Sequence, residues 1–396
     1  EEKASPVTIG LLDGQSGNII KRLNLYSDFI DEYMFYSFSP DHNSIIVSRA
    51  MEKSKKDPLE FEITVLDADL QNKKIVSCPL DFTAADVRDQ YIFIDNKRNI
   101  FIIYKVKEDK KATPAYHLAL LNETGKKTKD IELKFPDGFM PDMTFSFDRN
   151  AIQFGGLKSK GRKDDFTSFV SGSIDILSGN VNFKETALSS PQSNSDPANA
   201  KALSKGLSAD FVFDQSLKDE DGNYIYIFEK NNMNERIDKW GNPISGREIF
   251  TIKYFRRETL LAVRVNKDNS IAWIKIIPKI QEEPDMRVLS GIVSSLDENG
   301  TVHILFHDRD KNMDSKADEK PALFAISELK KSSLVDVSID KKGNMKKTQV
   351  QSDQDRESFV APDNCTYIKP GLISTLALNF HTFKKWDYNF GLLNIK

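Results

Sequence analysis

Cysteine, strong net charge and long apolar runs are all scarce in this chain. Its 396 residues include two cysteines, Cys78 and Cys365, which match no metal-binding or redox spacing, and we expect both to be buried thiols. The net charge is -3, from 56 basic and 59 acidic residues, so no global field favours nucleic acid. No apolar run approaches the roughly 18 to 20 residues that a membrane helix needs. The composition therefore predicts no membrane span and no nucleic-acid partner.

The common catalytic motifs are absent as well. The sequence has no Gly-x-Ser-x-Gly elbow, no His-Glu-x-x-His, no phosphate-binding glycine loop and no Cys–His pairing. His303 and His307 fall on the same side of one predicted strand. They would lie roughly 13 Å apart at the rise of a strand, which is too far to share a zinc ion. No reaction class is indicated by motif.

What the chain does contain is a repeated pattern of apolar strands and polar turns. Residues 297–347 give one clear copy, with Asp/Asn/Gly turns at 297–300 and 340–344 and a polar loop at 308–321 between them. Similar copies recur every 45 to 70 residues or so, and four strands per copy are the signature of a β-propeller. We therefore predict an all-β fold, a β-propeller of four-stranded blades. Two packed β-sandwich domains are the alternative.

The two ends of the chain carry the incomplete copies. The first residues read as the late strands of a copy, and the last copy lacks its final strand, so the terminal strands are predicted to close the ring. This gives one propeller domain of six blades, with seven as the alternative. The predicted segments are 1–27 for the closing strands, 33–80, 85–135, 140–188, 207–278 and 288–350 for full blades, 189–206 for an insertion, and 357–396 for the composite last blade. Within the insertion, Asp196 and Pro197 are suited to start a short helix ending at Gly206.

In such a fold the short turns lie on one face of the ring and the long polar loops on the other, which makes the long-loop face the candidate binding surface. The longest loop, 231–248, contains Trp240 with Arg236 and Arg247 nearby. An exposed Trp flanked by Arg is typical of a contact anchor. The alternative is that Trp240 only holds the loop against the ring.

One loop resembles a calcium site. Alternating oxygen side chains closed by a later carboxylate suit Ca²⁺, and here the residues are Asp308, Asp310, Asn312, Asp314 and Glu319. The loop departs from an EF-hand because Met313 stands where a Gly is needed for the sharp turn, and the flanking segments read as strands. A solvated acidic loop is the alternative.

Three runs, at 260–279, 306–312 and 335–343, resemble uncharacterised secreted or envelope proteins of Bacteroidetes-type bacteria. The resemblance covers roughly the last half of the chain. It implies an export route and a propeller-like repeat, but no activity. We accordingly expect a secreted, periplasmic or cell-surface protein whose signal peptide has been removed.

The sequence predicts a non-catalytic binding or scaffold protein of the cell envelope, whose long loops contact a protein or a glycan. The alternative is a polysaccharide hydrolase or lyase with carboxylates from several blades in the central channel. Fold alone does not choose between these two hypotheses. Two carboxylates about 5 to 10 Å apart would favour the enzyme.

Overall fold

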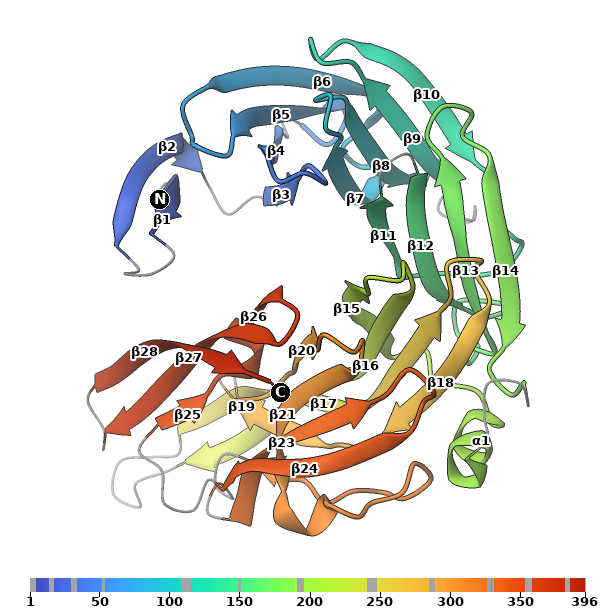
Figure 1. Cartoon of the computed structure of the whole chain (residues 1–396), viewed down its shortest axis with the longest axis vertical. Coiled ribbons are helices and arrows are strands. Elements are labelled where there is room, and N and C mark those ends of the chain that lie inside the picture. The colour runs from blue at the N-terminus through green and yellow to red at the C-terminus, as the bar shows by residue number, and fades with distance from the viewer. Residues whose placement is uncertain are drawn as a thin grey trace. The chain divides into compact units, whose positions relative to one another are not determined.

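β-Strands make up most of the chain. The computed structural model describes residues 5–13, 18–29, 34–51, 54–107, 115–148, 151–190, 196–240, 248–284, 289–325, 329, 331–352, 358–381 and 385–395. In the described residues, the strands form mainly antiparallel sheets, accompanied by one short α-helix and two 3₁₀-helices. Figure 1 shows the arrangement of these elements. The predicted all-β class is confirmed. Across the described part of the chain, no helix has the length and apolar character that a membrane crossing requires.

The chain divides into two compact units. The first comprises Glu1–Asp137, Phe145–Phe154 and Gly172–Asn182, and the second comprises Gly138–Thr144, Gly155–Ser171 and Phe183–Lys396. In the first unit, two sheets are four-stranded meanders in which consecutive strands are neighbours, as in a propeller blade. Their strands are β3 (Met34–Phe38), β4 (Ser44–Met51), β5 (Pro58–Asp67) and β6 (Lys73–Thr83), then β7 (Val87–Ile94), β8 (Ile100–Val106), β9 (Ala115–Leu121) and β10 (Lys127–Leu133).

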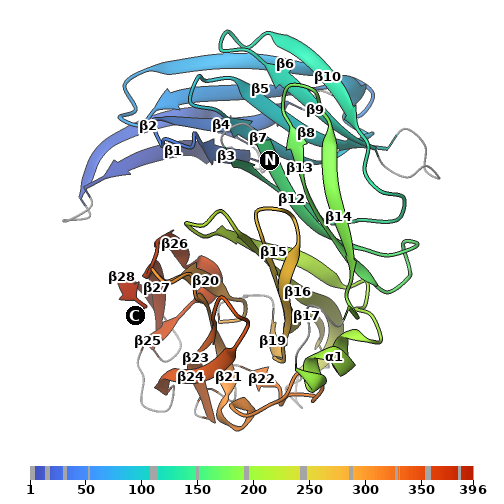
Figure 2. The same ribbon diagram turned by 45° about the vertical axis from the view of Figure 1, so that its right-hand side comes forward.

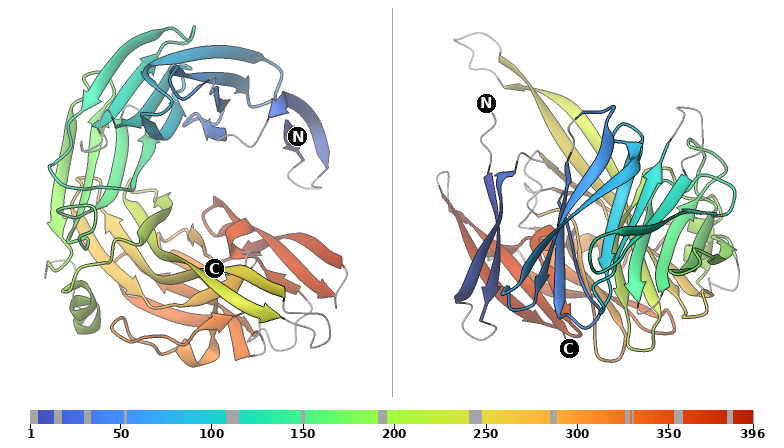
Figure 3. Two further views of the ribbon diagram at one scale, coloured as in Figure 1. Left: turned by 180° about the vertical axis from the view of Figure 1, so that it is seen from behind. Right: turned by 90° about the horizontal axis from the view of Figure 1, so that it is seen from above.

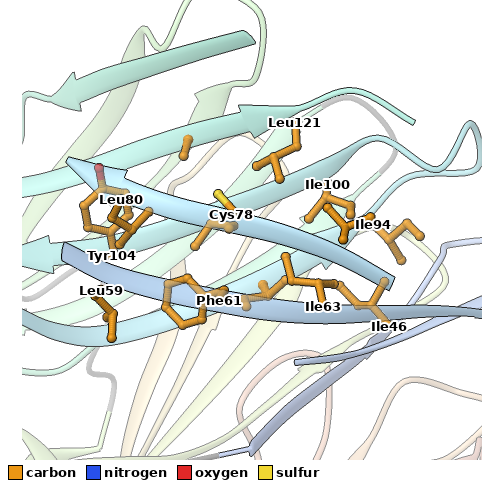
Figure 4. Packing of buried hydrophobic residues seen from close by; sticks show 14 of the residues in the cluster. Ile46, Leu59, Phe61, Ile63, Cys78, Leu80, Ile94, Ile100, Tyr104 and Leu121 are labelled. Carbon is orange, nitrogen blue, oxygen red and sulfur yellow. The ribbon is translucent and has the colours of Figure 1, made fainter. Parts of the chain in front are cut away.

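The core of the first unit lies between these two sheets. Successive side chains of a strand point to opposite faces, and Phe61 and Ile63 of β5 are buried on the same face. They pack with Ile100 and Tyr104 of β8 (Figure 4). Burying such a side chain contributes about 1.5–3 kcal/mol. Cys78 belongs to this core and burial raises the pKa of its thiol to about 11, so it is an inert packing residue.

Both cysteines are free and buried, as predicted. A further four-stranded meander, to which both units contribute residues, consists of β11 (Met143–Asp148), β12 (Ala151–Lys158), β13 (Ser168–Asp175) and β14 (Val181–Ala187). After it comes the helix α1 (Pro197–Leu203). The Asp196 carboxylate accepts a hydrogen bond from the Ala198 amide at 2.9 Å and so caps the helix. The predicted helix start is confirmed, but the helix ends before Gly206.

The second unit contains the longest strands of the molecule. β15 (Phe211–Lys218), β16 (Tyr224–Trp240), β17 (Glu248–Val265) and β18 (Ile271–Ile277) lie side by side in this order. β19 (Gln281–Pro284) pairs with the first half of β17, and β22 (Phe324–Ala325) runs parallel to β19. The hairpin of β16 and β17, yellow in the right-hand view of Figure 3, extends beyond the other strands of this unit.

That hairpin corrects the prediction of a long loop at residues 231–248. The two strands stay paired from Tyr224↔Val265 to Trp240↔Glu248, so most of the expected loop is strand. The polar side chains along it gave no alternation of apolar and polar residues. Pairing with the following strand, β17, which the sequence pattern does not show, continues the sheet instead.

Two more sheets complete the second unit (Figure 2). The first is a meander of β20 (Val293–Leu296), β21 (Val302–Arg309), β23 (Ser332–Ile339) and β24 (Met345–Ser352), and the last contains β25 (Ser358–Val360), β26 (Thr366–Lys369), β27 (Leu372–His381) and β28 (Lys385–Asn394). Because β25 and β26 pair with successive stretches of one edge of β27, and β28 with the other, the last sheet is three strands wide. This agrees with a copy that lacks its final strand.

The N-terminal strands do not complete that sheet among the residues described. β1 (Ser5–Leu12) and β2 (Ile19–Phe29) form a two-stranded sheet of their own. Closure of the ring by these strands therefore stays a prediction. The separate four-stranded meanders nevertheless have the form of propeller blades rather than of two large sandwich sheets.

The tight turns of the meanders share one construction. Asp219 accepts a hydrogen bond from the backbone amide of Asn223 at 2.8 Å and another from its side chain at 2.9 Å. Asp340 binds Asn344 in the same way, at 2.8 and 2.7 Å. Such Asx turns close a hairpin locally, so the Asp/Asn/Gly turn positions predicted from the sequence are confirmed at these hairpins.

Candidate functional site

Five charged side chains of the second unit interact with one another and are here called the charged cluster. Its members come from strands and turns that are distant in sequence: Asp214 of β15, Glu229 of β16, Arg257 of β17, Lys279 just after β18, and Asp363 of the 3₁₀-helix η4 (Pro362–Asn364). Charges are rarely buried unless they are paired. The contacts of each member therefore decide what the cluster can do.

Glu229 lies at the centre of the cluster. Its side chain is 0% exposed, because it follows the apolar run of β16 into the sheet. One carboxylate oxygen lies 3.2 Å from Arg257 Nη1, and the other forms an ion pair with Lys279 Nζ. A fully buried carboxylate cannot touch a substrate. Glu229 instead holds the two cations in place.

Lys279 is as deeply buried as its partner, with 0% of its side chain exposed. Its ammonium group also donates to Gln281 Oε1 at 2.6 Å and lies 5.8 Å from the centre of the Phe306 ring. Gln281 in turn donates to the backbone carbonyl of His307 at 2.8 Å. These contacts use the donors of Lys279 within the protein and fix its position.

Arg257 joins Glu229 to Asp363. Its guanidinium group donates two hydrogen bonds to the two carboxylate oxygens of Asp363, one of them 2.7 Å long. This bidentate geometry is the strong form of an Arg–carboxylate contact. The Asp363 side chain is 26% exposed and that of Arg257 13%, so this pair lies at the surface of the cluster. Burial raises the pKa of Asp363, and Arg257 opposes that rise by favouring the charged carboxylate.

The backbone beside this pair leaves no room for a side chain. Gly291 has φ +102°, and a Cβ atom there would collide with the Asp363 carboxylate and lie 2.6 Å from Arg257 Nη1. The amide of Gly291 donates to Gln281 Oε1 at 2.9 Å. Two amides just before it donate to Glu283, one of them from Ser290 at 2.8 Å. The segment at residues 289–291 is thus held against the Arg257–Asp363 pair.

Asp214 differs from the other carboxyl groups. It sits at a β-bulge, where the register of β15 against β16 shifts between Phe213 and Gln215. The strand is held on both sides of the bulge, since the Phe213 amide donates to Asp142 and the amide of Ser294 donates to Gln215 Oε1 at 3.0 Å. Bulges of this kind re-aim a side chain out of the regular ladder.

The Asp214 carboxyl group is only partly exposed, and the described residues make no hydrogen bond to it. Burial, together with the nearby charges of Glu229 and Asp363, raises its pKa to about 7. At neutral pH the group therefore carries a proton in a large fraction of the molecules. A protonated carboxyl group beside an ionised one is the arrangement that divides acid and base roles between two carboxylates.

The predicted calcium ligands have other partners in the structure. Asp308 is buried and forms an ion pair with Lys347, and it also accepts a hydrogen bond from Asn312 at 2.7 Å. Asp310 accepts from Ser333 at 2.6 Å. Asp314 and Glu319 are exposed, and Glu319 accepts from the amide of Lys316 at 3.0 Å. Within the described ranges, no group of three or more His, Cys, Asp or Glu residues is placed to hold a metal ion. Calcium stays a prediction that these contacts do not support.

The predicted contact anchor falls largely outside the described side chains. Arg236 and Trp240 belong to β16 near the end of the long hairpin, and Arg247 lies outside the described residues. Arg236 and Trp240 are therefore carried by a strand instead of the expected loop. Their role in binding stays a prediction.

Sequence reasoning missed the charged cluster, although part of it left a signal. Glu229 directly follows the apolar run of β16, and Lys279 lies two residues after the apolar β18. A charge at the end of a buried strand needs a partner. Asp214 and Asp363 gave no such signal, because a β-bulge and a short turn position them.

No family model matches the chain, and no curated protein matches it. Similar solved structures include the β-propeller domain of the Trilobed protease from Pyrococcus furiosus, at 9% identity and a TM-score of 0.44, covering 98% of this chain and 86% of that one. The polysaccharide lyase Uly1 matches at 9% identity and 0.45, covering 99% and 85%. An α-L-arabinofuranosidase from Fusarium graminearum matches at 9% and 0.39, covering 92% of each chain.

The hypothesis of a non-catalytic binding or scaffold protein is corrected by these findings. The solved structures that resemble this chain include a polysaccharide lyase and glycosidases. Because the identities are near 10% and the TM-scores lie below 0.5, the function proposed next rests on this chain's own residues. Those residues include Asp214 and Asp363, whose carboxyl groups have different surroundings in the charged cluster.

Proposed function

We propose that this chain is a glycoside hydrolase that cleaves a polysaccharide, with Asp214 as the general acid and Asp363 as the carboxylate that works with it. The observation that carries the proposal is the contrast between these two groups within one cluster. Asp214 has no hydrogen-bond partner among the described residues, whereas Asp363 is held by both arms of the Arg257 guanidinium group. Glycosidases use one protonated and one ionised carboxyl group in this way.

The reaction balances with water as the only co-reactant. Asp214 gives its proton to the glycosidic oxygen as the bond between that oxygen and the anomeric carbon breaks. Asp363 takes a proton from a water molecule, whose oxygen forms the new bond to the anomeric carbon. Asp214 then regains a proton from solvent and Asp363 releases one, so the net change is the addition of one water.

The remaining members of the charged cluster have positioning roles. Arg257 fixes the orientation of Asp363 and favours its ionised form. Glu229 and Lys279 are both fully buried, and they hold Arg257 through the Glu229 carboxylate. Glu229 also raises the pKa of Asp214 by placing a negative charge near it. The pair of catalytic carboxyl groups thus depends on groups that do not meet the substrate.

The number of blades, the closure of the ring and the location of the protein are further proposals. We infer that the four-stranded sheets are blades of a propeller with six blades, whose ring the terminal strands close. The three-strand width of the last sheet supports this inference, since one strand position there is unfilled by its own segment. A location outside the cytoplasm fits a substrate too large to be imported, and it rests otherwise on the resemblance of the sequence.

The test is an activity screen with purified protein on neutral and acidic polysaccharides, measured by the release of reducing ends. Wild-type protein should release reducing ends from at least one substrate, and D214N and D363N should each lose that activity. An elimination reaction would instead give an unsaturated product that absorbs near 235 nm. Release that both variants retain in full would contradict the assignment.

A further inference from the structure

The charged cluster contains more carboxyl groups than cations, and both of its cations are already engaged. Lys279 has no exposed surface and contacts Glu229 and Gln281. Arg257 is 13% exposed and binds the carboxylates of both Glu229 and Asp363. No positive group of the cluster is therefore left to receive an anion.

The cations next to the charged cluster are also paired with carboxylates. Arg256 lies 2.6 Å from Glu258 and 3.9 Å from Glu282, and Lys230 lies 2.8 Å from Glu258. The cations beside the cluster thus have carboxylate partners too. Glu283, which is also buried, adds a further carboxylate that binds backbone amides.

The groups that a substrate would meet are carboxyl groups. Asp214 and Asp363 are the members of the cluster that we propose to contact the sugar. The Asp363 side chain is more exposed than that of its partner Arg257. A carboxylate or sulfate on the sugar would be placed beside like charge in a partly desolvated site, which is unfavourable. A hydroxyl group, by contrast, can donate to the Asp363 carboxylate and accept from a protonated Asp214.

We propose that the sugar units on both sides of the cleaved bond are uncharged, bearing hydroxyl groups only, and that the site rejects uronic acids and sulfated sugars. This inference rests on the proposed hydrolase function, whose substrate class it names. It also explains why cleavage would proceed by hydrolysis. Elimination from a uronic acid requires a positive or hydrogen-bonding group to neutralise the sugar carboxylate, and the engaged cations do not supply one.

The experiment compares matched pairs of neutral and acidic polymers with the wild-type protein. Polygalacturonan and alginate are each paired with their own carboxyl-reduced form, and carrageenan with its desulfated form, so that each pair keeps the same backbone linkages, and initial rates are measured by reducing ends. At least one neutral polymer should be cleaved, and its acidic counterpart should be cleaved roughly tenfold more slowly or not at all, as expected for like charges at contact distance in a partly buried site. An acidic polymer cleaved as fast as its neutral counterpart, or faster, would overturn the inference while leaving hydrolysis intact.

A binding measurement separates charge from turnover. The inactive D214N protein is run in gels that contain either a neutral polymer or the acidic polymer of the same backbone. The neutral polymer that is cleaved should retard it, and the acidic one should not. In the double variant D214N/D363N, retardation by the acidic polymer should appear or increase, because a negative charge has been removed. Stronger retardation of D214N by the acidic polymer would overturn the inference.

A third outcome would contradict the proposed hydrolase function itself. If no polymer is cleaved by the wild-type protein and none retards D214N, the hydrolase function fails and the substrate class falls with it. The variant D221N serves as the control in both measurements, since Asp221 is exposed and contacts Lys341 outside the cluster. It should behave as the wild type does.

Discussion

Arg257 and Asp363 lie 106 residues apart in the chain, yet the guanidinium group of one donates two hydrogen bonds to the carboxylate of the other. The contact links strand β17 to the turn between β25 and β26 within the second unit. It fixes a carboxylate that remains partly exposed.

Gly291→Ala should disrupt the Arg257–Asp363 contact. A Cβ atom at this position collides with the carboxylate, and φ is +102°. We expect a loss of unfolding free energy of about 2–4 kcal/mol from overpacking and backbone strain together, and at least a tenfold fall in activity. Denaturant unfolding and initial rates measure the two effects.

Gly222→Ala is the matched control for that substitution. Gly222 has φ +86°, but a Cβ atom there meets nothing within 4 Å. It should cost only about 1–2 kcal/mol for the left-handed backbone and leave activity unchanged. Equal effects of the two substitutions would show that Gly291 matters through backbone strain alone and not through the ion pair.

Lys279→Met should destabilise the protein by about 3–5 kcal/mol, because it leaves the buried Glu229 carboxylate without its closest cation. The double variant with Glu229→Gln should recover part of that loss, since the unpaired charge is then gone. Denaturant unfolding of the two variants and the wild type measures both values.

The control for Lys279 is an exposed lysine in a pair of similar length. Lys341→Met removes a 2.7 Å contact with Asp221 at the surface and should leave the free energy of unfolding nearly unchanged. If Lys279→Met proved as mild as Lys341→Met, the buried pair would have no structural role.

The activity should fall as the pH rises above about 7. Asp214 must carry a proton to act as the acid, and burial with the charges of Glu229 and Asp363 raises its pKa to about 7. A profile of kcat/KM against pH measures this limb, on which the rate should drop about tenfold per pH unit. A rate that climbs between pH 7 and 9 would contradict an acid role for Asp214.

The same group gives a stability signature of defined sign. Its ordinary pKa is 3.8, so between about pH 4 and 7 the folded state holds a proton that the unfolded state has released. Stability contributed by the protonated form is therefore lost as the pH rises through that window. D214N has no titrating group at this position. The unfolding free energy of D214N, measured relative to that of the wild type, should therefore increase from pH 4 to pH 7.

His303 provides a second pH-dependent contribution, away from the charged cluster. Burial alone would lower the pKa of His303, but two carboxylates outweigh it and raise the pKa above the ordinary 6.5. Asp336 lies 2.8 Å from Nδ1, and Asp297 lies 3.9 Å from Nε2. The contribution is fully present below about pH 6.5 and is lost as the pH rises through the raised value. His303→Gln should thus cost more at pH 5.5 than at pH 9 in denaturant unfolding.

The parts of the fold that the sequence predicted well are those built from local contacts. The turn from Asp340 to Asn344 is closed by hydrogen bonds over four residues, so its residue types are sufficient to place it. The helix start at Asp196 is also set by a local contact, the hydrogen bond from the Ala198 amide to the Asp196 carboxylate. The β16–β17 hairpin was missed because its pairing extends a sheet through polar residues that show no alternation.

The site depends on contacts that no local pattern shows. Asp308 satisfies a calcium-like spacing, but in the fold it pairs with Lys347, 39 residues later. Asp214 and Asp363 are placed in the charged cluster by a bulge in one strand and a short turn between two others. Only the buried charges Glu229 and Lys279, which follow apolar runs, hinted that a polar site was present.

The measurement that tests the central claim most directly is the rate of polysaccharide cleavage by D214N beside that of D221N. Both variants replace Asp with Asn, but Asp221 contacts an exposed lysine outside the charged cluster. We predict that D214N loses 10²–10⁴-fold in rate, as expected for the removal of a general acid, while melting no lower than the wild type, and that D221N keeps full activity. Full activity of D214N on the substrate that the wild type cleaves would contradict the account.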